Sequence, residues 1–164
     1  MIPTVKFAKI TPNAIIPEYA HDGDSGFDFY TIEQGYVEFG MIEIVRTGLR
    51  VEMPFLGNTA GLGNQMPYQV TMELQLRAKS GLAAKQGISL VNGIGTIDFG
   101  YRGEIMIALT RVIPGCIRFE PGQKIAQGVF APVFNKQSLK FLEVSEEELN
   151  DTPRGEGGFG STGT

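Results

Sequence analysis

One stretch of the sequence, NGIGTIDFGYRGEI, combines residue types that suit the hydrolysis of a bound small molecule. Asp98 carries a carboxylate that can deprotonate a water, and the aromatic ring of Tyr101 follows shortly after it. Asn92 and Gly93 are typical of a tight turn, and Gly95 allows close approach of the backbone. The stretch predicts a hairpin whose free backbone edge can read a flat base. The alternative is an ordinary hairpin with a capping Asp98 and a half-buried Tyr101.

A second stretch, RAKSGLAAK, predicts an anion site at the start of a short helix. Ser80 is expected to cap the helix SGLAAKQG, and Gly87 to close it. Lys79 adds a cation, Ser80 a hydroxyl, and the first turn free N–H groups. Ordinary N-capping explains the same residues without a ligand.

The run AHDGDSGFDFYT places Asp22, Asp24 and Asp28 close together. Alternating acids suggest a calcium loop, but the bidentate glutamate that ends an EF-hand loop is missing. A surface turn with a capping aspartate accounts for the run equally well.

Gln127 is a polar residue within an apolar predicted strand, between Ile125, Ala126 and Val129 in KIAQGVFAPVF. A buried amide must be hydrogen-bonded. The partner of Gln127 is therefore either another side chain or a ligand.

The chain ends on RGEGGFGSTGT, residues 154–164. Such a glycine-rich segment is typical of a flexible tail. It also carries an arginine fork suited to phosphate, an aromatic ring on which a base can stack, and hydroxyl donors. A mobile tail that closes over a nucleotide would need this composition.

Composition excludes several kinds of chemistry. The chain has one histidine, His21, and one cysteine, Cys116, so neither a Cys/His zinc cluster nor an intrachain disulfide is available. No G-x-x-x-x-G-K-[ST] phosphate loop occurs, and the net charge of −4 disfavours a general nucleic-acid binder. No signal peptide or membrane-length apolar run is present, so we expect a cytoplasmic protein, or one of the host-cell cytoplasm if viral.

The 164 residues are expected to form a single domain of mostly short strands. The β-rich segments are VKFAKI, YVEFG, MIEIVRTGLRVEM, YQVTMELQLR, EIMIALTRVI, KIAQGVFAPVF and LKFLEV. Besides the short helix, Ser145 and Glu148 match a capping box for one turn at most. Residues 57–66 have no apolar period and predict a loop or hairpin insertion. These features predict an all-β sandwich, barrel or jelly roll.

In order and spacing, GDSGFDFY, KSGLAAKQGI, NGIGTIDFGYRGEI, GQKIAQ and RGEGGFGSTG resemble the five motifs of the trimeric deoxyuridine triphosphatases (dUTPases). The resemblance covers nearly the whole chain. It implies an antiparallel β jelly roll, a homotrimer with three shared active sites, and hydrolysis of dUTP to dUMP and pyrophosphate. It also implies in-line attack of water on the α-phosphorus, with Mg²⁺ on the triphosphate.

The resemblance also assigns roles around the base and sugar. Asp98 matches the general base, and Tyr101 matches the ring that packs on deoxyribose and excludes a 2′-hydroxyl. Met106 lies where substrate contact is expected, with packing as its equal alternative. The uracil-reading hairpin comprises Asn92, Gly95, Thr96 and Ile97.

Around the phosphates, Gln127 matches a phosphate and water contact. Asp28 matches a carboxylate that holds the site together through Mg²⁺-bound water. The stretch beside the scissile bond comprises Lys79, Ser80 and Gly81. In the tail, the γ-phosphate clamp, the ring that stacks on uracil and the end of the phosphate cradle are Arg154, Phe159, Gly160, Ser161 and Thr162.

The chain departs from the family pattern at two places. The family usually has arginine where this chain has Lys79, which keeps the charge but loses the planar fork. Arg77 would point the same way on an extended strand and share the task. The insertion at 57–66 is either inert or the contact for a protein partner. A dCTP deaminase of the same fold and a nucleotide-gated regulatory protein remain the alternative functions.

Overall fold

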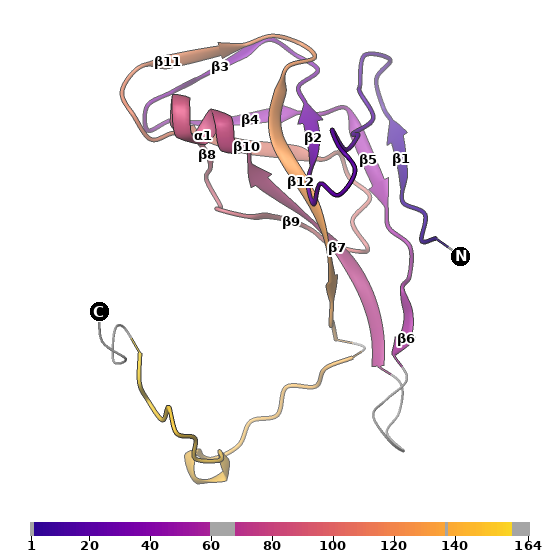
Figure 1. Ribbon diagram of the computed structural model, residues 1–164, viewed down its shortest axis with the longest axis vertical. Coiled ribbons are helices and arrows are strands. Elements are labelled where there is room, and N and C mark those ends of the chain that lie inside the picture. The colour runs from indigo at the N-terminus through magenta and orange to yellow at the C-terminus, as the bar shows by residue number, and fades with distance from the viewer. Residues whose placement is uncertain (1, 60–67, 137, 159–164) are drawn as a thin grey trace.

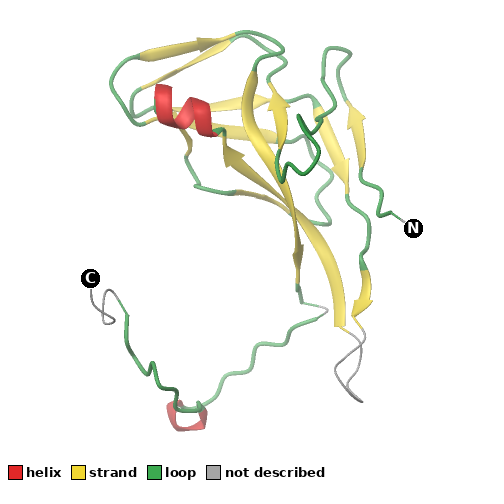
Figure 2. Ribbon diagram, in the orientation of Figure 1, coloured by secondary structure: helices red, strands yellow, loops and turns green. Residues whose placement is uncertain are grey.

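The computed structural model describes residues 2–59, 68–136 and 138–158, and it consists mainly of antiparallel strands (Figures 1 and 2). The predicted all-β fold with one short α-helix is confirmed. The strands are β1 (Lys6–Lys9), β2 (Phe27–Tyr30), β3 (Gly35–Glu38), β4 (Ile42–Arg46), β5 (Leu49–Glu52), β6 (Gly57–Thr59), β7 (Tyr68–Ala78), β8 (Ile88–Leu90), β9 (Gly95–Ile97), β10 (Met106–Arg111), β11 (Cys116–Phe119) and β12 (Lys124–Val133).

The longest sheet runs in the order β2-β12-β7-β6, and β9 also pairs with β7. A second sheet runs β4-β10-β8, and two further pairs are β1-β5 and β3-β11. The buried apolar side chains form one core, which includes Phe29, Leu74, Leu76, Ile105 and Ile107. On β7, Leu74 and Leu76 are buried on either side of the half-buried Gln75.

The helix α1 (Ser80–Gln86) begins one residue earlier than predicted. Lys79, with extended backbone angles, is its N-cap, and no side-chain cap is present. The expectation that Ser80 caps the helix is therefore wrong, because Ser80 is already the first helical residue. Gly87 closes the helix as predicted, with a left-handed φ of 64°.

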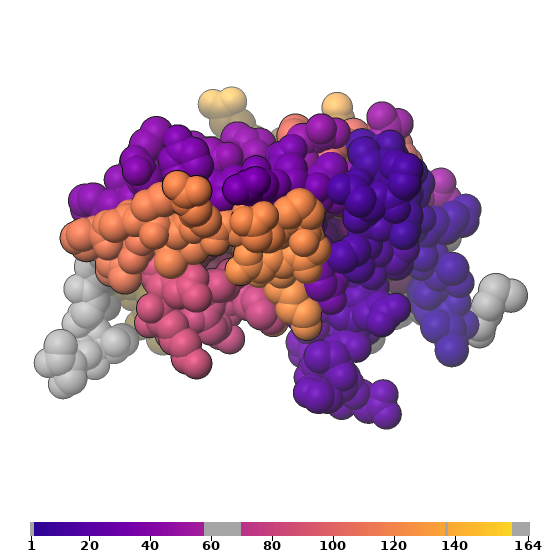
Figure 3. Space-filling model, turned by 90° about the horizontal axis from the view of Figure 1, so that it is seen from above, coloured from indigo at the N-terminus to yellow at the C-terminus, as the bar shows by residue number. Residues whose placement is uncertain are grey.

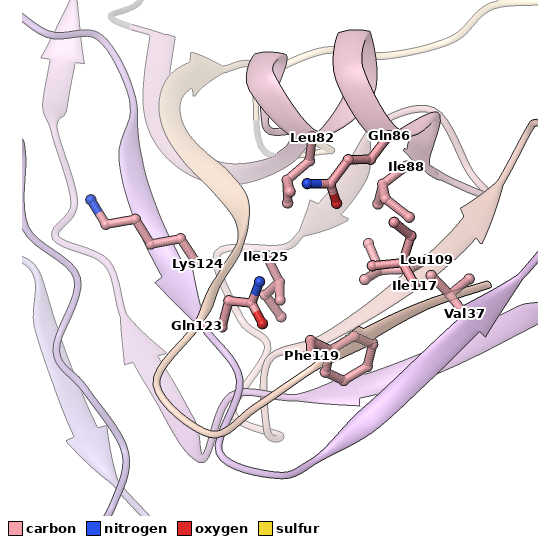
Figure 4. Close-up of a pocket in the computed structure, with 10 residues that line it drawn as sticks. All are labelled: Val37, Leu82, Gln86, Ile88, Leu109, Ile117, Phe119, Gln123, Lys124 and Ile125. Atoms are coloured by element: carbon pink, nitrogen blue, oxygen red, sulfur yellow. The ribbon is translucent and has the colours of Figure 1, made fainter. Parts of the chain in front are cut away.

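The helix packs beside β11 and the start of β12, next to β3 (Figure 3). Beneath it lies a small cavity whose lining includes Leu82, Ile88, Leu109, Ile117 and Phe119 (Figure 4). At about 20 Å³ the cavity is large enough for about one water and far too small for a nucleotide.

Beyond β12 the chain leaves the body as a C-terminal arm, residues 134–158 (Figure 1). The predicted strand LKFLEV is wrong, because this segment runs along the arm without regular structure. Its Phe141 is 95% exposed. The predicted capping box is confirmed, since Ser145 and Glu148 exchange both hydrogen bonds around η1 (Glu146–Glu148).

The expected insertion falls at the end of the longest hairpin. β6 pairs with the start of β7, in the register Gly57↔Val70, and residues 60–67 lie outside the described part of the chain.

Among the described residues, neither the length nor the apolar character of any helix is sufficient for a membrane span.

Candidate active site

The most strongly linked charged cluster in the structure is centred on Asp28. This carboxylate is buried on β2, and its oxygens face two lysines: Nζ of Lys79 lies 2.6 Å from Oδ1, and Nζ of Lys124 lies 2.7 Å from Oδ2. The three residues come from β2, the N-cap of α1 and the start of β12. The cluster therefore ties the phosphate-binding candidate Lys79 to the central sheet.

The charges of the cluster reinforce one another. Burial raises the pKa of Asp28, but the hydrogen bonds and charges of Lys124 and Lys79 outweigh it and leave the pKa below its ordinary value. Hydrogen bonding to Asp28 raises the pKa of Lys124 in turn. Asp28 is therefore ionised near neutral pH, and both lysines have a fixed counter-charge.

Gln127 lies at the centre of this surface. On β12 it stands opposite Asp28 of β2 on one side and opposite Arg77 of β7 on the other. Directly opposed residues point to the same face of a sheet. The half-buried amide of Gln127 is therefore flanked by an acid and a cation. Arg77 in turn donates to the side chain of Gln75.

The predicted base-reading stretch is built differently from the predicted hairpin. Its turn is present, with the N–H of Gly93 donating to the carbonyl of Leu90 at 3.1 Å. However, β8 joins β10 whereas β9 joins β7, so the two limbs lie in different sheets. The expectation of a paired hairpin is wrong. Long-range pairing with β7 and β10 decides where each limb goes.

Gly95 packs closely against side chains of its own chain. A Cβ at this buried position would lie 3.2 Å from Cβ of Leu76 and 3.4 Å from Nδ2 of Asn92. Thr96, next along β9, is exposed, and Ile97 packs partly against the core. Met106, at the start of β10, is 47% exposed, which argues against simple packing within this chain.

Asp98 and Tyr101 form the two ends of a turn. The N–H of Tyr101 donates to the carbonyl of Asp98 at 3.0 Å, and both side chains are exposed. The carboxylate of Asp98 therefore stands at the surface beside the backbone of β9, where a water and a ligand have access.

One chain does not bring the phosphate and base candidates together. Ile97, next to Asp98, stands opposite Leu74 of β7, whereas Lys79 follows the far end of β7. At about 3.3 Å per residue, the two positions are roughly 17 Å apart along the strand. Lys79, Ser80 and Gly81 thus form one group on one chain, and Asp98 and Tyr101 form another.

Of the predicted tail residues, the structure describes Arg154. It is exposed on the C-terminal arm, where its Nε donates to the carbonyl of Gly157 at 2.9 Å. The others, Phe159, Gly160, Ser161 and Thr162, lie outside the described residues.

The acidic run near the start of the chain forms a turn rather than a calcium loop. The backbone N–H of His21 donates to Oδ2 of Asp24 at 3.0 Å, and Asp22 and Asp24 are exposed. Asp28 points elsewhere, into the lysine cluster. Within the described residues, no group of three His, Cys, Asp or Glu side chains could hold a metal.

Over residues 2–59, 68–136 and 138–158, the side chains therefore do not form a protein cage for Mg²⁺. Both oxygens of Asp28, the residue expected near the metal, are taken by lysine ammonium groups. A metal at this site would need its ligands from elsewhere, and the phosphates of a nucleotide are such ligands.

Sequence reasoning missed Lys124 and Glu104. Lys124 stands three residues before Gln127 in GQKIAQ, and a shift in strand register between Lys124 and Ala126 is associated with its contact to Asp28. Glu104 accepts from Arg46 and from the N–H of Gly48. The only sequence feature that could have indicated either residue is its charge within a motif, GQKIAQ for Lys124 and NGIGTIDFGYRGEI for Glu104.

Comparison with known proteins matches this arrangement to a single family. The dUTPase family model matches residues 64–163. The deoxyuridine 5′-triphosphate nucleotidohydrolase of Alkaliphilus metalliredigens is 41% identical over 97% of this chain and 96% of its own length. The enzyme of the same name from Crocosphaera subtropica is 42% identical, over 97% and 98%. The structure of the dUTPase of Staphylococcus bacteriophage 80alpha with dUPNHPP superposes with a TM-score of 0.77 at 25% identity, covering 98% of this chain and 99% of that one.

Proposed function

The chain belongs to the dUTPase family, and we propose that it hydrolyses dUTP to dUMP and pyrophosphate with Asp98 as the general base. The observation that carries this proposal is the surface at the end of β9. There the exposed side chains of Asp98 and Tyr101 lie next to the backbone of β9. A carboxylate with access to water, an exposed ring and a strand backbone are what attack beside a bound nucleoside requires.

In the proposed reaction, a water molecule attacks the α-phosphorus in line through its oxygen. The Asp98 carboxylate accepts a proton from this water during the attack. The bond from that phosphorus to the α–β bridging oxygen breaks, and its electron pair leaves with pyrophosphate. A backbone hydrogen bond from Tyr101 closes the turn that carries Asp98, and the exposed carboxylate is accessible to water before substrate arrives. Phosphoryl transfer depends mainly on such positioning and on charge stabilisation.

The uracil edge presents acceptor, donor, acceptor, and we assign its recognition to the backbone of β9 with Asn92. Gly95 lies so close to Leu76 that a larger residue there would have to displace its neighbours. Cytosine would leave backbone groups mispaired, which is a large penalty at a polar site. Met106 is exposed at the start of β10, in the other sheet, and is assigned to substrate contact.

The triphosphate is assigned to Lys79, Ser80 and Gly81 with Gln127, and to the tail from Arg154 through Phe159, Gly160, Ser161 and Thr162. The family uses Mg²⁺, which when bound neutralises charge on the triphosphate. We place it on the phosphates rather than on Asp28, because both oxygens of that carboxylate are occupied by lysines. Arg77, on the same face as Gln127, adds positive charge where Lys79 lacks the arginine fork.

We infer a homotrimer with shared sites from the separation of the two groups along β7. A single chain leaves about 17 Å between them, which neighbouring subunits would have to bridge. The outer face of β4 and β10 supports self-association, because Ile42, Ile44 and Met106 are each about half exposed on adjacent positions. The exposed apolar residues of the C-terminal arm offer a second contact.

The function is tested by incubating the purified protein with dUTP and Mg²⁺ and identifying the products. Release of pyrophosphate and dUMP, with dCTP, dTTP and UTP turned over far more slowly, would support the proposal. Ammonia and dUTP from dCTP would instead identify a deaminase of the same fold. Binding of dUTP with no product would leave a regulatory nucleotide-binding protein.

A second role, binding a protein partner through residues 57–66, is favoured by the hairpin of β6 and β7, which projects from the body (Figure 1). Replacing residues 60–66 with a short turn should leave dUTP hydrolysis within about twofold, because no residue assigned to substrate lies there. A pull-down that depends on this segment and on nucleotide would support the partner role. Equal capture by the shortened variant would overturn it.

A further inference from the structure

The hydroxyl end of the Tyr101 ring lies against Gly103. A Cβ built on Gly103 would stand 2.5 Å from Cζ of the ring and closer still to the hydroxyl. Gly103 is not among the glycines with a positive φ, so its backbone angles suit any residue. A larger residue at position 103 would therefore displace the ring, whereas the conformation of the turn does not call for glycine.

A hydrogen bond holds the other end of the ring. The hydroxyl of Tyr101 donates to the backbone carbonyl of Glu104 at 3.0 Å. The carboxylate of Glu104 is itself fixed: it accepts from Nε of Arg46 at 3.2 and 3.1 Å and from the N–H of Gly48 at 2.9 Å. Strand β4 and the turn that follows it therefore hold Glu104, whose backbone carbonyl accepts the hydrogen bond from the ring hydroxyl.

The Tyr101 ring nevertheless remains partly exposed. The side chain is 39% exposed, although its hydroxyl end contacts Gly103 and is bonded to Glu104. A ring that is held at its hydroxyl end and still exposed is suited to pack against a ligand.

We propose that Gly103 and Glu104 are positioning residues that set the plane of the Tyr101 ring and thereby determine how strongly deoxyribose is selected over ribose. This inference rests on the proposed function. Ribose differs from deoxyribose by a single oxygen, so the ring that excludes it must be held to within a fraction of an ångström. Gly103 has no side chain that would displace the ring of Tyr101. The backbone carbonyl of Glu104 accepts the hydrogen bond that keeps the ring from rotating.

The decisive measurement is the ratio of kcat/KM for dUTP to kcat/KM for UTP. In Gly103→Ala the new methyl group displaces the ring, and we expect the ratio to fall at least about 10-fold. Gly100→Ala is the matched control, because a Cβ on Gly100 meets nothing within 4 Å in the same loop. The ratio for Gly100→Ala should stay within about twofold of the ratio for the wild-type protein. Equal ratios for the two variants would overturn the proposal.

Tyr101→Phe provides a second test should Gly103→Ala fold poorly. It keeps the ring and removes only the donor to Glu104. If the ring acts by packing alone, the ratio stays unchanged, and the anchoring role of Glu104 is overturned. If the hydrogen bond to Glu104 holds the ring in place, the ratio falls. The fall then comes mainly from a higher kcat/KM for UTP, while kcat for dUTP changes less.

Failure of the proposed function would look different. If the unchanged protein does not hydrolyse dUTP at all, the assignment of the reaction fails before any variant is compared. If it hydrolyses dUTP selectively and Gly103→Ala is equally selective, only the positioning role is wrong.

Discussion

The Nζ atom of Lys79 lies 2.6 Å from Oδ1 of Asp28, so the lysine assigned to the phosphates is held by a buried carboxylate on another strand. To contact a phosphate, Lys79 must weaken this ion pair. Lys124, 2.7 Å from the other oxygen, can neutralise Asp28 while Lys79 turns to the ligand. The two lysines and the acid therefore work as a unit of three charges.

Lys124→Met should raise KM for dUTP by about 5-fold, with a smaller effect on kcat. Without Lys124, the Asp28 carboxylate binds Lys79 alone and competes more strongly with the phosphates. The effect is modest because the Lys124 side chain is 44% exposed, where solvent screens the charge. Steady-state kinetics measure it, and Lys124→Arg should restore KM. An unchanged KM in Lys124→Met would show that Lys79 does not depend on this counter-charge.

The stability of the protein should fall at acid pH in a way that depends on Asp28. Its pKa in the folded protein lies below its ordinary value of 3.8, so the ionised form stabilises the fold. That stabilisation is complete above about pH 4 and is lost as the pH falls through the folded-state pKa. Urea unfolding from pH 7 to pH 3 should show a steeper loss below pH 4 for the unchanged protein than for Asp28→Asn. Parallel curves would contradict the assignment.

Asp98→Asn should lower kcat by about 10²- to 10⁴-fold, the usual contribution of a general base. The side chain is exposed on a turn, so the fold should be unaffected. Pyrophosphate release measures the rate, and circular dichroism with a thermal melt checks the fold. Retention of dUTP binding with lost turnover is the expected pattern. A loss of binding equal to the loss of rate would argue against a role as base.

Removing residues 154–164 should lower kcat/KM for dUTP by at least about 100-fold and leave the melting temperature nearly unchanged. The hydrogen bonds of Arg154 within the described arm are local, to Gly157, so the body does not depend on it. Phe159→Ala alone should cost about 10- to 100-fold in dUTP affinity, the worth of one stacking contact. A truncated protein with full activity would show that the tail plays no part in the site.

Local patterns in the sequence were sufficient for the elements that local physics controls. The capping box of Ser145 and Glu148 and the left-handed Gly87 depend on neighbouring residues only, and both were predicted. The strand character of β7 and β12 also follows from their composition. Short elements such as β2, which carries Asp28, were read as polar loop because four residues hold too little pattern.

Long-range pairing could not be predicted in the same way. The limbs of NGIGTIDFGYRGEI look like one hairpin, but β8 is taken by β10 and β9 by β7. The ion pairs of Asp28 depend on β2 lying beside β12, which nothing local indicates. The sequence motifs thus identified most candidate residues. The ion pair of Lys124 with Asp28 and the contact of Gly103 with the Tyr101 ring could be identified only from the structure.

The pairing of β2 with β12 also sets the order in which the site is built during synthesis. These strands come from opposite ends of the chain, and β12 fills the gap between β2 and β7. On the ribosome, β2 and β7 must wait with unpaired edges until β12 emerges. Strand pairs so distant in sequence are slow to close and exposed to aggregation. The same step that completes the sheet brings Lys124 to Asp28, so a nascent chain cannot assemble its phosphate-binding charges before its fold is nearly finished.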